Sequence, residues 1–232
     1  GCFTSTRNPM SSPTNTHARR TGLRAAAIGL ALGVSAIASC NIATPIAYAI
    51  YGPGKVEARF ELDPEASTVV FVDDPNSQVG RRRDRDIVAQ TATQTLLSKG
   101  LVIDMVDPQA ATLAATKERH GAALSITEIG AAVDADVIVY ALLTEFTLSA
   151  DGNAYNPSAV LRVKVLDRRT GGRIWPDDPR GSTVRIRPEF RPGELPQDQA
   201  DLAEANADLA SRAGLAIAQL FYKHEITESV SR

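Results

Sequence analysis

Aromatic residues and cysteines are scarce in this 232-residue chain. Aromatics make up 5% of it, so stacking platforms for bases or sugars are not expected. The two cysteines, Cys2 and Cys40, both precede any folded pattern, which excludes a disulfide framework. Basic residues show no excess, since 25 Lys and Arg face 27 Asp and Glu, and this excludes a protein that coats nucleic acid. With 44% hydrophobic residues, the composition suits one globular domain with additional segments.

A long apolar run is also missing, but a short one follows a basic stretch near the start. Arg19-Arg20-Thr21-Gly22-Leu23-Arg24 precedes an uncharged run from Ala25 to Ala38. A run of about 14 residues has the length of a signal-peptide core and is shorter than the roughly 18 to 20 residues of a membrane-spanning helix. The order predicts a lipoprotein signal peptide over residues 1–39, with Met10 as an alternative translation start. The sequence leaves Sec and twin-arginine export open.

The end of this leader carries the most specific short motif in the chain. Ile37-Ala38-Ser39-Cys40 resembles the lipobox of bacterial lipoproteins, in which the cysteine thiol is acylated and becomes the first residue. We therefore predict signal cleavage between Ser39 and Cys40 and lipidation, palmitate included, at Cys40. Acyl chains contribute about 0.8 kcal/mol per buried methylene, so several chains form a stable membrane anchor. An ordinary signal peptide with an incidental cysteine is the alternative.

The mature chain is expected to consist of a tether, one domain and a short tail. Cleavage before Cys40 leaves 21 basic and 27 acidic residues, so the mature chain has no polybasic excess for anionic lipid. Residues 40–66 are interpreted as the lipidated cysteine and tether, because Gly52-Pro53-Gly54 interrupts any period. Residues 67–224 are predicted to form the domain, and 225–232 the tail. Residues 56–62 alternate, which predicts a short edge strand or an arm packed along the domain.

Hydrophobic periodicity and turn residues give the expected order of elements within the domain. Ser125 and Glu128 match a capping box, and the stretch from Asp167 to Gly172 is a hairpin turn. Strands are predicted at 68–72, 101–106, 136–148, 159–166 and 173–175, and helices at 84–99, 109–122, from 125 and 198–222. The order predicts an α/β fold with a single mixed β-sheet of four to five strands flanked by three to four helices.

Two of these segments also carry a family resemblance. Val133-Asp134-Ala135-Asp136-Val137 enters the central strand, and Asp167-Arg168-Arg169-Thr170-Gly171-Gly172-Arg173-Ile174-Trp175 forms the hairpin. Together, and behind a lipobox, they resemble the superfamily of periplasmic and outer-membrane lipoproteins with an anticodon-binding-domain-like fold. This superfamily includes the curli secretion lipoprotein CsgG, the polysaccharide-export lipoprotein PelC, the penicillin-binding-protein activator LpoB and the amino-terminal domain of TolB. The resemblance covers roughly residues 66 to 222.

The resemblance implies a membrane-anchored lipoprotein of the bacterial cell envelope, with its domain outside the cytoplasm. The expected role is non-enzymatic: a scaffold or regulator of an envelope assembly or export system that binds an envelope protein. The alternative is a subunit of an oligomeric secretion channel of the curli-secretion type, which makes a homo-oligomer an open question. The chain lacks the long amphipathic stretch that would form the membrane-spanning hairpins of that channel. Asn41 after Cys40 resembles an outer-membrane sorting choice.

Catalytic and metal-binding patterns are weak in this sequence. His120 and His224 stand far apart among helix-end charges, and the acidic pairs Asp73-Asp74, Asp134 with Asp136 and Asp177-Asp178 sit where strands start or stop. We therefore expect the protein not to be an enzyme and to have no cofactor and no metal site. After the scaffold and channel-subunit roles, a hydrolase that uses the Asp73-Asp74 pair is the third alternative. A Pro-rich segment, 176–196, is predicted to be an insertion-like loop. The candidate partner-binding residues in and beside it are Trp175, Arg187, Phe190 and Arg191.

Overall fold

The computed structural model describes residues 54–119, 122–149, 154–188 and 195–225 of the chain. The described residues form ten strands and four helices, and they belong to one compact unit, Gly54–Arg232. The strands are β1 (Lys55–Val56), β2 (Thr68–Asp73), β3 (Met105–Val106), β4 (Glu118–Arg119), β5 (Ala122–Ala123), β6 (Val137–Thr147), β7 (Ser158–Asp167), β8 (Arg173–Trp175), β9 (Ser182–Ile186) and β10 (His224–Glu225). The helices are α3 (Arg82–Ser98), α4 (Pro108–Ala115), α5 (Ile126–Ala132) and α6 (Gln199–Ala218).

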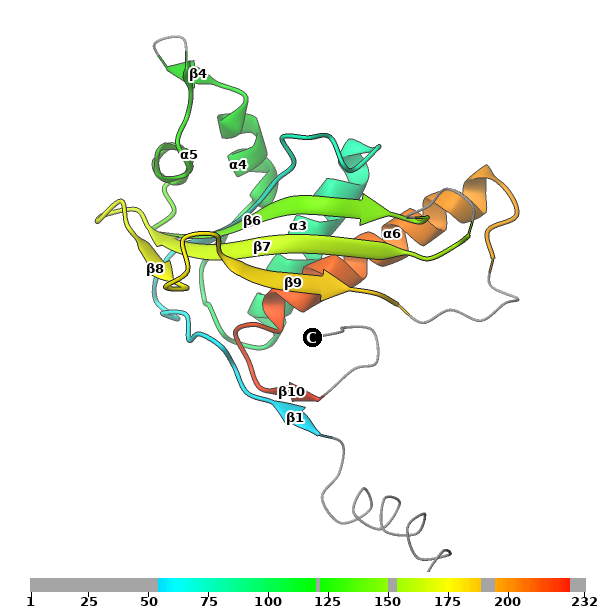
Figure 1. Cartoon of the computed structure of the whole chain (residues 1–232). Helices are drawn as coiled ribbons and strands as arrows, with labels where there is room; N and C mark the ends of the chain where they lie inside the picture. The colour runs from blue at the N-terminus through cyan, green and yellow to red at the C-terminus, as the bar shows by residue number, and fades with distance from the viewer. Residues whose placement is uncertain (1–53, 120–121, 150–153, 189–194, 226–232) are drawn as a thin grey trace, which may run out of the picture. The chain divides into compact units, whose positions relative to one another are not determined.

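A six-stranded mixed sheet forms the centre of the unit, which confirms the predicted fold class. β2 pairs in parallel with β3 on one side and with β6 on the other, and β6 pairs antiparallel with β7. β8 and β9 both pair antiparallel with β7, β8 near one end of the strand and β9 near the other. The sheet therefore runs in the order β3-β2-β6-β7, with β8 and β9 along its far edge (Figure 1).

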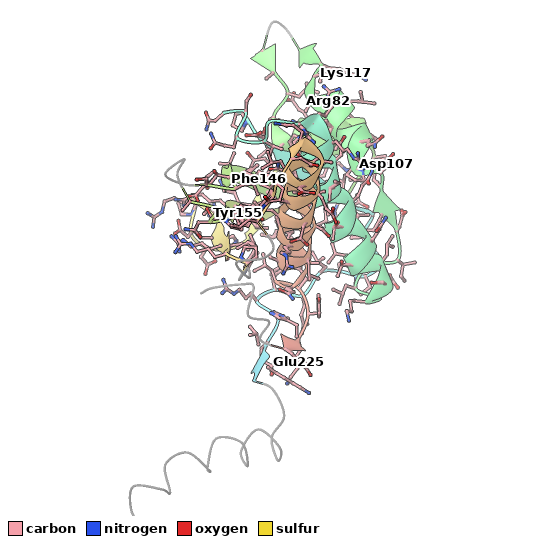
Figure 2. The ribbon with its side chains drawn as sticks, turned by 90° about the vertical axis from the view of Figure 1, so that its right-hand side faces the viewer. Arg82, Asp107, Lys117, Phe146, Tyr155 and Glu225 are labelled. Atoms are coloured by element: carbon pink, nitrogen blue, oxygen red, sulfur yellow. The ribbon has the colours of Figure 1, made fainter. Side chains whose placement is uncertain are left out.

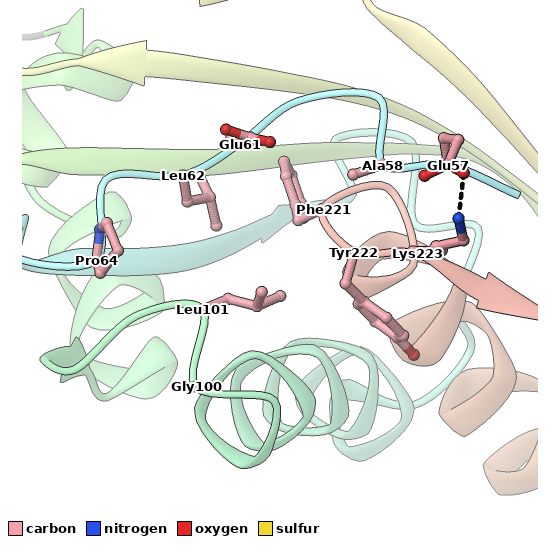
Figure 3. A pocket seen from close by; sticks show the side chains of 10 residues that line it. All are labelled: Glu57, Ala58, Glu61, Leu62, Pro64, Gly100, Leu101, Phe221, Tyr222 and Lys223. Atoms are coloured by element: carbon pink, nitrogen blue, oxygen red, sulfur yellow. Dashed lines mark hydrogen bonds and ion pairs between the residues drawn. The ribbon is translucent and has the colours of Figure 1, made fainter.

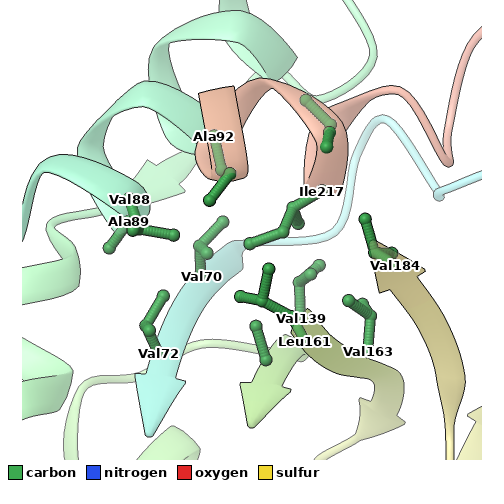
Figure 4. Close-up of a cluster of buried hydrophobic side chains, with 14 of the residues drawn as sticks. Val70, Val72, Val88, Ala89, Ala92, Val139, Leu161, Val163, Val184 and Ile217 are labelled. Atoms are coloured by element: carbon green, nitrogen blue, oxygen red, sulfur yellow. The ribbon is translucent and has the colours of Figure 1, made fainter. Parts of the chain in front are cut away.

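Helices α3 and α6 cover one face of the sheet and enclose the larger core. β-Branched and leucine side chains of the strands meet a helix surface rich in small residues (Figure 4). Alanines on both helices and a glycine on α6 let the two helices lie close to each other and to the sheet. The residues concerned are Ala89 and Ala92 of α3 and Ala210, Ala213 and Gly214 of α6, all of them buried.

The opposite face is covered by α4 and α5 over β2 and the first half of β6. Ile129 of α5 and Ala111 of α4 pack there against Phe71 and Ile138. The predicted capping box opens α5, because the Glu128 N–H donates to Ser125 Oγ (3.3 Å) and the Ser125 N–H donates to Glu128 Oε2 (2.9 Å). Within the described residues no helix covers β7 and β9 on this side (Figure 1).

The first described residues pack along the unit as an arm. β1 pairs antiparallel with β10, so Lys55 lies opposite Glu225. Farther along, the N–H groups of Arg59 and Phe60 donate to the Leu220 carbonyl (2.7 and 3.3 Å), and Leu62 is buried in the larger core. Residues 56–62 thus pack as the predicted arm. The alternative prediction, an edge strand of the main sheet, is wrong. Figure 2 shows Glu225 at the opposite end of the unit from Arg82 and Lys117.

Three other segments differ from the predictions. Residues 101–106 yield a two-residue strand, because the Leu101 and Ile103 amides donate to Leu96 (3.1 Å) and Pro64 (3.0 Å) instead of to β2. The predicted helix 109–122 ends at Ala115, where i→i−3 bonds tighten its last turn, and β4 pairs with β5 beyond it.

The largest correction concerns 176–196, which is not one long loop. Ser182–Ile186 forms β9 and pairs with β7 over five residues, with Leu161 opposite Val184. Val184 and Ile186 are buried in the larger core, so this segment extends the sheet. Among the described residues, no helix is both long and apolar enough to cross a membrane.

Candidate binding surface

Four of the predicted functional residues lie outside the described residues: Ser39, Cys40, Phe190 and Arg191. Cleavage and lipidation at Ser39 and Cys40 therefore remain predictions. His120 is also outside the described part of the chain, while His224 lies in β10 with its Nδ1 3.0 Å from the Tyr222 carbonyl.

Trp175 ends β8 and is half-buried between the arm and the C-terminal end of α6. Its ring centroid lies 5.9 Å from that of Phe60 and 6.1 Å from that of Phe221, the second in an edge-on arrangement. Aromatic pairs at these separations add to the free energy gained by burying their area. In this geometry Trp175 packs the arm against the rest of the unit. Arg187, the other described member of the predicted partner loop, lies away from Trp175, at the end of β9.

The acidic pairs make structural contacts. Asp73 accepts a hydrogen bond from the Tyr140 hydroxyl (2.8 Å), and Asp74 accepts from the backbone N–H groups of Gln78 and Val79. Burial and the contact with Asp73 together raise the pKa of the Tyr140 hydroxyl. Within the described residues no group of three or more His, Cys, Asp and Glu side chains is placed to hold a metal ion.

The other two pairs bind arginines. Asp134 and Asp136 accept from the Arg168 guanidinium at 3.2 and 2.8 Å, which joins the central strand entry to the hairpin. Asp178 accepts from the backbone N–H and side chain of Arg180, and these contacts hold the pKa of the Asp178 carboxyl below its ordinary value. Both motifs that carried the family resemblance therefore meet at Arg168.

A hollow of about 430 Å³ lies between the arm and the segment after α6 (Figure 3). Leu62, Leu101 and Phe221 form its apolar part, and the ion pair of Lys223 with Glu57 stands at its rim. The Lys99 ammonium lies 5.2 Å from the centre of the Tyr222 ring, and burial raises the pKa of the Tyr222 hydroxyl. A second hollow of about 350 Å³ has an acidic lining that includes Asp63, Glu65 and Asp167, with Arg169 beside them.

Positively charged residues lie on the side of β7 and β9 that no described helix covers. Leu161, Val163, Val184 and Ile186 point into the larger core, so the residues between them point outward. The outward residues include four cations, Arg162, Lys164, Arg185 and Arg187, which we call the cationic face. Arg185 and Arg187 are exposed, and Arg162 and Lys164 are half-buried.

The pairing of β7 with β9 brings these cations together. Arg162 lies opposite Thr183 and Val160 opposite Arg185, so Arg162 and Arg185 are diagonal neighbours, about 7–8 Å apart at the backbone. The nearby carboxylates have partners: Glu145 accepts from the Ser158 hydroxyl, and Asp178 binds Arg180. Of the four cations, Arg187 alone was predicted from the sequence as a binding residue, because Arg185 was assigned to a loop. The alternation of Val184, Arg185 and Ile186 is the signal that could have revealed the rest.

Comparisons with known proteins give likeness at the level of solved structures. No protein-family profile and no curated protein sequence matches the chain. A PelC dodecamer from Paraburkholderia phytofirmans is similar to it at 12% identity and a TM-score of 0.41, covering 72% of this chain and 97% of the PelC variant chain. The hypothetical protein CT253 from Chlamydia trachomatis is 16% identical, with a TM-score of 0.40 over 66% of this chain and 93% of that one.

A third similar structure is the lipoprotein GNA1162 from Neisseria meningitidis. It is 15% identical, with a TM-score of 0.34, and the match covers 63% of this chain and 99% of that chain. The fold assigned above rests on the strand pairing and the core of this chain itself.

Proposed function

We propose that the protein is a lipoprotein of the bacterial cell envelope, anchored through Cys40, whose α/β unit acts by binding other molecules. The observation that carries this proposal is the order of segments along the chain. A basic stretch and an apolar run end in Ile37-Ala38-Ser39-Cys40, and the compact unit begins at Gly54. An acyl-bearing Cys40 would hold that unit at a membrane surface.

The spacing between anchor and unit supports this arrangement. Thirteen residues, 41–53, separate Cys40 from Gly54. Fully extended, such a segment reaches at most about 45 Å. The unit would therefore stay within reach of the headgroups and of proteins embedded beside it. The backbone N–H groups of Arg59 and Phe60 donate to the Leu220 carbonyl, so a pulling force on the tether would be transmitted to the folded unit.

A binding role is also supported by what the ionisable side chains do. Asp73, Asp134, Asp136 and Asp178 each contact a tyrosine or arginine of the unit's own framework. These contacts give the four carboxylates a structural role, which supports a binding role for the unit. The face of β7 and β9 that no described helix covers, by contrast, presents exposed charged side chains, which supports a binding role.

The anchor is tested by metabolic labelling of the full chain in a bacterium. Cells expressing it are fed an alkyne-bearing palmitate analogue, with and without an inhibitor of the lipoprotein signal peptidase. We expect label on the protein, and accumulation of the uncleaved form when the inhibitor is present. Cys40→Ser should abolish both label and membrane association, whereas the matched control Cys2→Ser should change neither. A labelled or membrane-bound Cys40→Ser protein would disprove the anchor.

The finer proposal is a scaffold or regulator of an envelope assembly or export system at the periplasmic face of the outer membrane. Crosslinking in native membranes, detergent extraction, affinity purification and mass spectrometry test it. One envelope protein captured in a fixed ratio is the expected result. A ladder of self-crosslinks ending at a discrete ring size would instead favour the channel-subunit alternative. Separation of inner and outer membranes on a density gradient tests the location.

A further inference from the structure

We propose that the open edge of β9, with the cationic face beside it, binds an extended acidic peptide segment of a partner protein by strand addition. This inference deepens the proposed binding role by giving the chemistry of the partner. Three features carry it: unpaired backbone groups on β9, four cations at defined positions beside them, and a sheet surface that lacks a covering helix in the described part of the chain.

The first feature is the direction of the backbone groups on β9. The Thr144 hydroxyl of β6 donates to the Val160 carbonyl at 3.0 Å, so this carbonyl points toward β6. In antiparallel sheets the N–H and C=O of one residue point to the same side, so Val160 and its partner Arg185 form a non-hydrogen-bonded pair. The N–H and C=O of Arg185, and by the same alternation those of Thr183, therefore point to the outer edge.

That edge is open over the described residues. β9 pairs with β7 alone, and no other described strand lies beside it. The arm approaches its first residue, where Arg59 donates to the Ser182 hydroxyl at 3.2 Å, and does not extend along the strand. An unpaired strand edge is a template for an added strand, whose backbone bonds give affinity and whose alternate side chains give specificity.

The second feature decides which side chains the added strand should carry. Residues opposite Arg185 and diagonal to it on an added strand would have their Cβ atoms about 5–8 Å from its own. Aspartate or glutamate at alternate positions would thus meet Arg185 and Arg187, with Arg162 and Lys164 one strand farther in. The mature chain carries six more acidic than basic residues, so this cationic face is a local reversal of the protein's charge.

Two other occupants fit less well. A second copy added edge to edge through β9 would place Arg185 and Arg187 of one copy against the same residues of the other, and like charges facing each other across a strand pair are destabilising. An anionic membrane surface would satisfy the cations, but its phosphates have no donors for the backbone C=O groups of Thr183 and Arg185. The acidic peptide satisfies both, which is why we choose it.

The test uses the purified full chain in detergent micelles and a fluorescent nine-residue peptide with alternating glutamate and threonine. A second peptide has the same sequence and charge but is N-methylated at its glutamate amides, which face β9 when glutamate lies opposite Arg185 in an antiparallel pair, so it cannot pair along that edge. A third replaces glutamate by lysine. Fluorescence anisotropy gives the dissociation constants. Flotation with vesicles that contain anionic phosphatidylglycerol tests binding to a membrane.

We expect the glutamate peptide to bind at least tenfold more tightly than both the N-methylated and the lysine peptides. Arg185→Gln with Arg187→Gln should weaken this binding at least tenfold. Arg82→Gln with Lys117→Gln removes the same charge at exposed positions elsewhere (Figure 2) and should leave it within twofold. Unchanged thermal unfolding of both double variants shows that the fold is retained.

Several outcomes would overturn the inference. Equal binding of the N-methylated peptide would show that charge alone attracts it, and equal weakening by the control variant would show that the site is not at β9. Vesicle binding without peptide binding would assign the cationic face to the membrane, and absence of all binding would leave the face without this role. The anchor and the strand addition are tested independently. A wild-type chain that is not labelled but still binds the peptide would disprove the anchor and leave the strand addition supported.

Discussion

Gly214 of α6 lies so close to Val88 of α3 that a β-carbon on Gly214 would stand 2.4 Å from the Val88 carbonyl oxygen. The same β-carbon would lie 2.7 Å from the Thr91 Cβ and 3.1 Å from the Ala92 nitrogen. Two of these three neighbours are backbone atoms, which move only if the helix moves. The absence of a side chain at Gly214 therefore sets how closely the two helices of the larger core approach.

We predict that Gly214→Ala lowers the free energy of unfolding by about 2 kcal/mol, since overpacking of a close contact costs about 1–3 kcal/mol and alanine's higher helix propensity offsets less than that. Urea denaturation followed by circular dichroism measures the change. Gly80→Ala is the control, because a β-carbon there meets nothing within 4 Å. A Gly214→Ala protein as stable as the Gly80→Ala protein would mean that the helices can separate without loss.

Asp84 predicts a dependence of stability on pH. Its carboxyl is buried in the first turn of α3, and this burial raises its pKa above the ordinary 3.8, an effect that Arg81 and Arg83 partly oppose. The folded chain thus holds the proton more tightly than the unfolded chain does. Stability contributed by this group is present below the ordinary pKa and is lost as the pH rises through the raised value.

Asp84→Asn should therefore raise the melting temperature near neutral pH, and the difference from wild type should vanish below about pH 3.5, where both chains are neutral at this position. Differential scanning fluorimetry from acid to neutral pH follows it. Arg81→Gln with Arg83→Gln, which removes the opposing cations, should steepen the loss. Parallel curves for wild type and Asp84→Asn at all pH values would contradict the prediction.

The Tyr140–Asp73 hydrogen bond couples β6 to the end of β2. We expect Tyr140→Phe to lower the free energy of unfolding by about 1.5–3 kcal/mol, because a bond to a charged acceptor is lost in a mostly buried place. A double-mutant cycle with Asp73→Ala, which removes the acceptor, isolates the pair when measured by urea denaturation. A coupling energy near zero would show that the two side chains contribute independently.

Ser125 allows a smaller and more local test. Ser125→Ala removes the hydroxyl that accepts from the Glu128 N–H, and loss of such a cap costs about 1 kcal/mol. Ser98→Ala removes an exposed hydroxyl that donates to Thr95 at the end of α3, and should change stability by less than about 0.5 kcal/mol. Hydrogen exchange should show faster opening of α5 in Ser125→Ala. Equal exchange in both variants would argue against the cap.

The parts of the fold that could be predicted from sequence are those specified by neighbours along the chain. Ser125 and Glu128 are three residues apart, and Asp167 accepts from the amides of Arg169 and Thr170 within one turn. Such contacts join residues that are close along the chain, so the local sequence favours them directly. The long strands β6 and β7 were predictable for the same reason, because β6 has a continuous apolar run over residues 137–143 and β7 alternates over residues 161–165.

What could not be predicted depends on distant pairing. β9 is only five residues long and is flanked by prolines on both sides. It forms a strand because it pairs with β7, and this pairing sets its register and buries Val184 and Ile186. The cationic face requires that same register, since Arg162 and Arg185 become neighbours through it. Trp175 was grouped with the partner loop because the sequence does not reveal that Phe60 and Phe221 enclose its ring.

The pairing of β1 with β10 has a consequence for how this unit can be rewired. Because Lys55 lies opposite Glu225, the chain enters and leaves the fold at adjacent points. Ends that lie so close can be joined by a short linker, and new ends opened at the exposed turn of Thr170 and Gly171, to give a circular permutant with the same neighbours in its core. If the proposed anchor is carried over to the new amino terminus, such a permutant would be held at its hairpin instead of at its arm.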